Sequence, residues 1–340
     1  MLTVKPTNQM NSGSQASALH GGNELHFAKN GSGFALIFLL ILISVGAMTV
    51  VVNQLSATAT KSHIDAVTAK ALMAAKTAII GWSALNGTAP GKLPCPEDTA
   101  KIGTGLEGQA ATLCSNSTPT VGRLPWKTLG VDRLIDGYGE PLWYALSPGF
   151  RVSPINAGTP ASLTLDGIPH AGVAIVFSPG PPLSNQHRPA FSNTSPPQPG
   201  DYLDLGNGDG DFDFISRGNK AEFNDQSLAI SSQELAKVIV ARVAGDLLGY
   251  PDKGLKQFFN IHGFLPCAAT AIGGDSVPSN SHGYFPEGNI DITFDSATKN
   301  MLDDNHWFDL IQFDVPGCGT PGANTAVVSI GMNAVRLNLQ

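Results

Sequence analysis

Carboxylate and amide side chains alternate with glycine along residues 204–213. Side-chain oxygens at alternate positions of a glycine-bent loop suit a hard cation such as Ca²⁺, which takes about six to eight oxygen ligands. The segment is not an EF-hand, because Phe212 stands at the sixth position from Asn207, where that loop needs glycine. We therefore predict either a calcium site or a solvated acidic turn. The candidate ligands are Asp204, Asn207, Asp209, Asp211 and Asp213.

The four cysteines fall into two pairs by neighbourhood, Cys95 with Cys114 and Cys267 with Cys318. Four cysteines permit three connectivities, and pairing within each half of the chain is the simplest. A zinc site is the alternative, although the chain has no C-x-x-C spacing. Disulfides would place this part of the chain in an oxidising compartment, the periplasm or the cell exterior.

No recognised catalytic motif occurs in the chain. It has no G-x-S-x-G, no H-E-x-x-H and no P-loop. A catalytic triad is recognised by geometry rather than by sequence order, so the sequence alone leaves that arrangement open. His187 beside Arg188 could line a pocket, but such residues are more often at the surface. We predict that the protein is not an enzyme.

Composition argues against nucleic-acid binding. The formal net charge of the 340 residues is −7, and charged residues make up only 14% of the chain. A nucleic-acid binder needs clustered cations to neutralise phosphates. The many glycines and prolines, 38 and 24, indicate short strands joined by turns.

The longest predicted element is a helix over residues 34–85. Its first part, residues 34–52, has no charge and no proline, and as a helix it would rise close to the roughly 30 Å of a bilayer core. We predict that this part spans a membrane, with a cleaved signal peptide and a buried core helix as the alternatives. Beyond it, apolar residues from Leu55 to Trp82 recur mostly at three and four, which predicts a helix with one buried face.

The junction of Gly33 and Phe34, followed by this apolar run, resembles the N-terminus of type IV pilins and type II secretion pseudopilins. The resemblance implies that a prepilin peptidase cuts after Gly33 and that Phe34 is then N-methylated. It also implies a single-pass protein of a bacterial inner membrane with a periplasmic C-terminal region. Phe38 stands where most members have glutamate, as in some minor subunits at a fibre tip.

Further segments carry the same resemblance. Residues 136–144, Asp-Gly-Tyr-Gly-Glu-Pro-Leu-Trp-Tyr, are similar to a turn and strand of the major pseudopilin, with Tyr138 in place of tryptophan. Residues 122–126 and 223–226 are similar to segments of uncharacterised proteobacterial pilin-like proteins. Independently of the resemblance, the residue types predict tight turns at residues 136–139 and a buried strand at residues 172–178.

The expected fold is α+β, a long helix leading into a pilin-like helix and antiparallel sheet, with two related modules. Each half offers a helix, a Leu-Pro-Cys segment and an aromatic strand, residues 141–146 and 306–311, which suggests an internal duplication. Ser231 and Glu234 form a capping box that opens the second helix, which is predicted to stop near Gly249 and Pro251. The predicted divisions are a leader or cytoplasmic tail (1–33), the long helix (34–85), a first module (86–200), an Asp/Gly-rich connection (201–230) and a second module (231–340).

The residues and the resemblance together favour two possible functions. The first is a minor pilin or pseudopilin-like subunit of a type IV pilus or type II secretion system. Its partners would be the prepilin peptidase, other pilin subunits, an inner-membrane assembly platform and the lipid bilayer. The second is a membrane-anchored binding module, an adhesin or a substrate-recognition protein, that is not built into a fibre.

Overall fold

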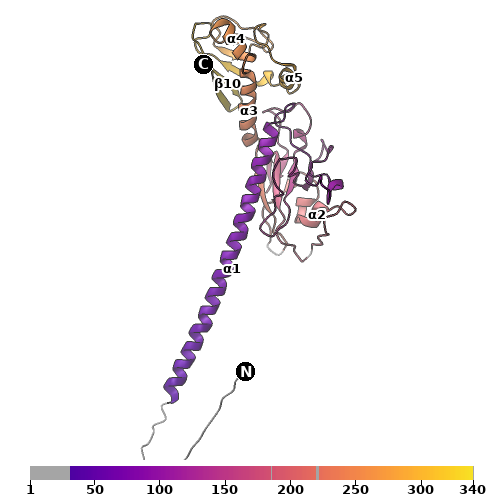
Figure 1. The fold of residues 1–340 in the computed structure, drawn as a ribbon, viewed down its shortest axis with the longest axis vertical. Coiled ribbons are helices and arrows are strands. Elements are labelled where there is room, and N and C mark those ends of the chain that lie inside the picture. Colours follow the sequence, from indigo (N-terminus) through magenta and orange to yellow (C-terminus); the bar gives the residue numbers. More distant parts are fainter. Residues whose placement is uncertain (1–30, 185, 220–221, 340) are drawn as a thin grey trace, which may run out of the picture. The chain divides into compact units, whose positions relative to one another are not determined.

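The computed structural model describes residues 31–184, 186–219 and 222–339, and for most of residues 31–57 it describes the backbone alone. The chain divides into two compact units, residues 1–58 and residues 59–340. Figure 1 follows the elements along the chain, from α1 in indigo and purple to β10 in yellow.

Five α-helices lie in the described residues. They are α1 (Gly31–Ala84), α2 (Pro199–Tyr202), α3 (Ser232–Leu248), α4 (Gly254–His262) and α5 (Ser296–Asp304). Short 3-10 helices occupy Thr99–Lys101, Pro148–Phe150, Leu205–Gly208 and Phe308–Leu310. The predicted leader, apart from residues 31–33 at the start of α1, lies outside the described residues.

The strands form three sheets. The first, in the order β1-β2-β5-β7, is antiparallel throughout, as is the second, in the order β11-β10-β9-β8. The third sheet, β4-β3-β6, pairs β3 with β6 in parallel. The bounds are β1 Thr120–Arg123, β2 Trp143–Leu146, β3 Leu163–Leu165, β4 Ile168–Gly172, β5 Ala174–Ser178, β6 Asp213–Phe214, β7 Gln226–Ile230, β8 His282–Tyr284, β9 Gln312–Asp314, β10 Thr325–Ile330 and β11 Asn333–Asn338. The predicted α+β class with antiparallel sheets is therefore confirmed.

The predicted membrane-spanning helix over residues 34–52 is not supported, and this part of the fold prediction is wrong. Across the residues that the structure describes, no helix combines the length and the apolar character that crossing a bilayer requires. C-terminal to this segment, the described side chains of α1 divide between two faces, with Lys61 and Lys70 exposed and Leu72 and Ile79 buried. This part of α1 has the single buried stripe that the spacing of its apolar residues predicts.

The buried stripe of α1 belongs to the main core of residues 59–340. Ala71, Leu72, Ala75 and Ile79 pack in one cluster with side chains of β2 and β5, among them Tyr144, Leu146, Ala174 and Val176. Alternate residues of the same two strands, Trp143, Ala145, Ile175 and Phe177, enter a second cluster with Leu163 and Phe214. The first sheet is therefore buried on both faces, which is why β2 and β5 are continuous apolar runs.

Helix α3 lies beside the end of α1 and begins and ends where the sequence predicts. Ser231 caps it by accepting a hydrogen bond from the Glu234 N–H, and Gly249 ends it in the left-handed conformation. Lys76 of α1 donates to Glu234 at 2.6 Å and to the Ala229 carbonyl at 3.0 Å. The apolar face of α3 joins the same core cluster, so the two predicted modules share one core.

The predicted aromatic strand over residues 306–311 is wrong. The chain turns back after α5, because His306 adopts a left-handed φ of 54° and the Trp307 N–H donates to the Leu302 carbonyl at 2.9 Å. A 3-10 helix follows over Phe308–Leu310, and the strand β9 begins at Gln312. Trp307 and Phe308 are both buried in this arrangement.

Candidate functional site

The structure divides the five predicted calcium ligands into two buried and three exposed residues. Asp204 is the N-cap residue of the 3-10 helix Leu205–Gly208, Asn207 lies within that helix, and both residues are buried. Asp209, Asp211 and Asp213 are exposed. Asp209 Oδ1 accepts from the Asp211 N–H, and Asp211 Oδ1 accepts from the Asp213 N–H. These carboxylates therefore shape turns.

Asn207 holds the loop to the strand segment that follows it. Its Oδ1 accepts from the Ile215 N–H at 2.9 Å, and its Nδ2 donates to the Ile215 carbonyl at 3.1 Å and to Asp225 Oδ2 at 2.9 Å. Both ends of the amide are thus engaged with protein groups.

Asp204 forms a buried acidic pair with Asp225, a residue that is not among the predicted ligands. Asp204 Oδ2 accepts from the N–H groups of Asn224 and Asp225, and Asp225 Oδ2 accepts from the Asp204 N–H at 2.9 Å. Burial raises the pKa of Asp204, and burial together with the nearby Asp204 charge raises the pKa of Asp225 to about 7. The signal that could have found Asp225 was its place in the Phe-Asn-Asp-Gln segment at 223–226.

The five predicted ligands are dispersed in the structure, two of them buried and three exposed. Over the part of the chain that the structure describes, no group of three or more His, Cys, Asp or Glu side chains is arranged to hold a metal ion. The acidic pair contributes two carboxylates, and three of their four oxygens already accept protein hydrogen bonds.

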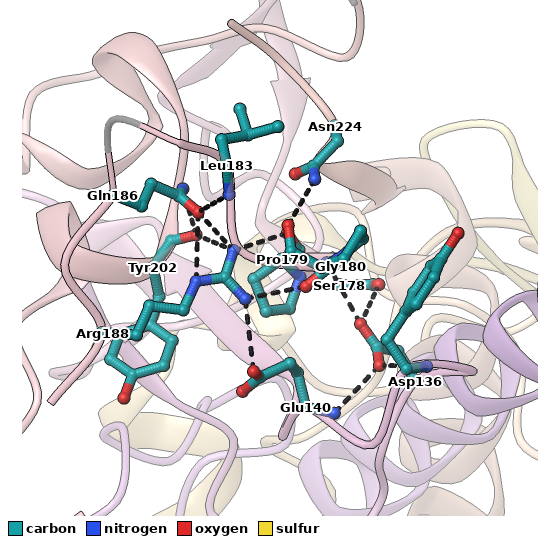
Figure 2. A network of polar contacts seen from close by, with 12 residues as sticks. Asp136, Glu140, Ser178, Pro179, Gly180, Leu183, Gln186, Arg188, Tyr202 and Asn224 are labelled. Atoms are coloured by element: carbon teal, nitrogen blue, oxygen red, sulfur yellow. Dashed lines mark hydrogen bonds and ion pairs between the residues drawn. The ribbon is translucent and has the colours of Figure 1, made fainter. Parts of the chain in front are cut away.

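Arg188 is the centre of a polar network drawn in Figure 2. Its Nη1 donates to the Gly180 carbonyl at 2.7 Å, and its Nη2 donates to the Pro179 carbonyl at 3.0 Å and to Gln186 Oε1 at 2.6 Å. Glu140 Oε1 lies 3.4 Å from Arg188 Nη1, and its negative charge balances that of the guanidinium. A guanidinium presents several donors in a fixed plane, which suits several carbonyl oxygens in one loop.

Asp136 anchors the other side of this network. Its Oδ1 accepts from the N–H groups of Tyr138 and Glu140, and its Oδ2 accepts from Ser178 Oγ at 2.7 Å and the Gly180 N–H at 3.1 Å (Figure 2). Gly137 beside it packs on α1, where a Cβ atom would lie 2.4 Å from the Ile64 carbonyl oxygen. The Asp-Gly pair is thus explained by loop anchoring and by close helix approach.

A second cluster pairs Glu97 with Arg123 at the edge of the first sheet. Glu97 Oε2 lies 3.0 Å from Arg123 Nε, and Arg123 Nη2 donates to Glu107 Oε1 at 3.2 Å. Burial raises the pKa of Glu97, although the Arg123 charge opposes that shift. The guanidinium also lies 4.2 Å from the centre of the Phe191 ring.

The histidines do not assemble a triad in the described residues. His262, His282 and His306 pair with Asp291, Asp314 and Asp309 respectively, and all three are exposed. No hydrogen bond described in the structure joins any of them to a serine hydroxyl. His187 is exposed, whereas its neighbour Arg188 is the buried centre of the network above.

Both predicted disulfides form. Cys95 bonds to Cys114 and Cys267 bonds to Cys318, and no free cysteine is found. Gly33 and Phe34, the predicted processing residues, fall in the first turn of α1, where the structure describes the backbone alone. Comparison of the chain with protein-family models, curated proteins and solved structures finds no match.

Proposed function

We propose that the chain is a non-enzymatic, pilin-like or pseudopilin-like subunit of a type IV pilus or type II secretion system. Helix α1 would contact neighbouring subunits, and the domain packed on its C-terminal part would face an oxidising compartment. The observation that supports this proposal is the packing of one face of α1 on a four-stranded antiparallel sheet. The resemblance at Gly33 and Phe34 implies the same arrangement.

The use of the buried charges also supports a structural role. Most side-chain hydrogen bonds of the buried charged residues join them to backbone groups of loops, as at Arg188, Asp136 and Asp204. A catalytic acid, base or nucleophile has to keep a group available to a substrate. The disulfides support an exported location, since such bonds persist in oxidising compartments.

The proposal names the processing step and the partners. A prepilin peptidase would cut after Gly33, and other pilin or pseudopilin subunits would pack against α1. Helices that associate closely need small residues at the contact, and Ser44, Gly46 and Ala47 offer them.

N-terminal mass spectrometry of the protein from its native host tests the processing step. We expect a chain that begins at N-methylated Phe34, and we expect Gly33→Val to prevent that maturation. Gly31→Val is the matched control, because it changes the same residue type two positions earlier in α1. Normal maturation of the Gly33→Val variant would contradict the proposal.

A second experiment separates a fibre subunit from a binding module. Residues 34–52 are exchanged for an unrelated helical sequence of equal length, and assembly is followed by cross-linking to neighbouring subunits. The structural role predicts that assembly is lost. A binding module would keep its activity after the exchange.

A further inference from the structure

A cavity of about 340 Å³ lies along the outer edge of the first sheet. All four residues of β1, Thr120–Arg123, line it, and Trp143 of β2 lines it as well. Three further segments line it. They are the segment around Cys114, which its disulfide ties to Cys95, the residues Pro96, Glu97 and Thr99, and the proline-rich run Pro196–Pro199. The volume falls within the range of ligand pockets, about 300–1,000 Å³.

Strand β1 is an edge strand with a partly open side. Among the described strands it pairs with β2 alone. The Glu97 N–H donates to the Arg123 carbonyl at 2.9 Å and so occupies one end of the open side. Backbone groups alternate in direction along a strand, so the N–H and C=O of Val121 point to the same side as that carbonyl. In the described part of the chain no other backbone hydrogen bond reaches this side.

The charges beside the cavity are already balanced. Arg123 pairs with Glu97 and Glu107, and Arg133 lies 3.6 Å from Glu107. Two cations therefore face two carboxylates, and an ionised ligand would upset that balance. An occupant that is uncharged where it meets β1 fits better.

Residues that line the cavity hold buried donors without a hydrogen-bond partner. Thr120 Oγ1, Arg123 Nη1 and Trp143 Nε1 make no hydrogen bond in the described residues and are shielded from solvent. A buried donor left unpaired costs about 1–3 kcal/mol. Neutral N–H and guanidinium donors of this kind suit carbonyl oxygens, which an extended peptide supplies at regular intervals.

We infer that this cavity binds an extended, uncharged peptide segment of a partner protein, which adds as a strand to the open side of β1. Main-chain hydrogen bonds to Val121 hold the segment, and alternate side chains enter between the Cys114 wall and the proline run. The inference goes beyond the proposed function and does not depend on it, because a strand-binding site suits a subunit or a free binding protein equally.

Hydrogen exchange of the full chain tests the inference with a defined uncharged probe, the peptide acetyl-Gln-Thr-Val-Thr-Val-Thr-Gln-amide. We expect the probe at about 1 mM to slow exchange of the Val121 amide about tenfold, since each factor of ten is about 1.4 kcal/mol. The control probe has the same sequence with both valines N-methylated, so that it cannot pair as a strand. We expect that control to leave the Val121 exchange unchanged.

A pair of matched variants locates the site. Leu113 lines the cavity and is 86% exposed, so Leu113→Arg places a charge at its mouth without disturbing the core. We expect this variant to weaken the probe about tenfold or more, a loss of about 1.4 kcal/mol. Leu106, which is 50% exposed and outside the lining, supplies the control Leu106→Arg. Equal protection by both probes, no protection of Val121, or equal binding by both variants would overturn the inference.

Discussion

Asn305 joins separate segments of the chain through one buried amide. Its side chain is 0% exposed and follows α5 directly. Oδ1 accepts from the Ile155 N–H at 3.0 Å, and Nδ2 donates to the carbonyls of Thr88 and Met301 at 2.9 and 2.8 Å. Ile155 and Thr88 belong to the first predicted module and Met301 to the second. Asn305→Ala should therefore weaken the contact between the two.

The expected loss in the free energy of unfolding follows from the backbone groups that Asn305→Ala leaves without a hydrogen-bond partner. The substitution removes three hydrogen bonds and strands one backbone donor and two backbone acceptors. Each unpaired buried group costs about 1–3 kcal/mol. The space vacated by the amide can admit water, which lowers the cost toward the bottom of that range. We expect the free energy of unfolding to fall by about 3 kcal/mol.

Urea unfolding with the disulfides intact measures this loss. Tryptophan fluorescence and far-ultraviolet circular dichroism should give the same midpoint, which tests whether the transition is two-state. Asn260→Ala is the control, because Asn260 is an exposed residue of α4 and a surface change of this kind shifts stability by about 0.5 kcal/mol or less. A loss for Asn305→Ala below about 1 kcal/mol, at the low end of the cost of a single unpaired group, would refute the reasoning.

Three further predictions concern the buried charges and the disulfides. The raised pKa of Asp225 means that the folded state binds its proton more tightly, so its contribution to stability is present below about pH 4 and is lost as the pH rises toward 7. Comparing the free energy of unfolding at several values in that range should show a steeper fall for the native chain than for Asp225→Asn, and equal slopes would contradict this assignment. Arg123→Met leaves the Glu97 carboxylate buried without its partner and should cost about 3–5 kcal/mol in urea unfolding, whereas Arg336→Met, at an exposed site, should cost about 0.5 kcal/mol or less. Replacing both members of a disulfide by serine should cost about 3 kcal/mol for Cys95–Cys114 and more for Cys267–Cys318, because their separations are 19 and 51 residues. The opposite order in thermal or urea unfolding would count against a loop-entropy origin.

Local signals predicted the helices that have caps and the strands that are buried. Ser231 with Glu234 marks the start of α3, and Gly249 marks its end, because these residues satisfy backbone groups within a few positions of themselves. The apolar run that became β5 needs no distant information either, since its residues are buried on both faces. The pairing of the cysteines by neighbourhood also agrees with the structure.

The predictions that failed have different causes. Residues 306–311 have strand-forming side chains, yet the turn at His306 and the hydrogen bond from Trp307 to Leu302 give them a different backbone. The membrane-spanning prediction over residues 34–52 relied on an apolar run in the sequence, and the described helices do not support it. Asp225 was overlooked because its partners, Asp204 and Asn207, are about twenty residues away in the chain and no periodic pattern connects them.

The acidic loop that suggested a metal site has a structural explanation in the length of its connection. Between β5 and β7 the chain runs from Ser178 to Gln226, with α2, a 3-10 helix and the two-residue strand β6 as its regular elements. Ladder hydrogen bonds are too few to satisfy the backbone of such a segment, so side chains must do so. Arg188 takes the carbonyls of residues 179 and 180, and Asp204 takes the amides of residues 224 and 225. Short polar side chains at close spacing supply these hydrogen bonds, and in the sequence they resemble metal ligands. The same connection supplies the Pro196–Pro199 wall of the cavity beside β1. Substituting Arg188 should therefore weaken peptide binding at this cavity and also lower the free energy of unfolding.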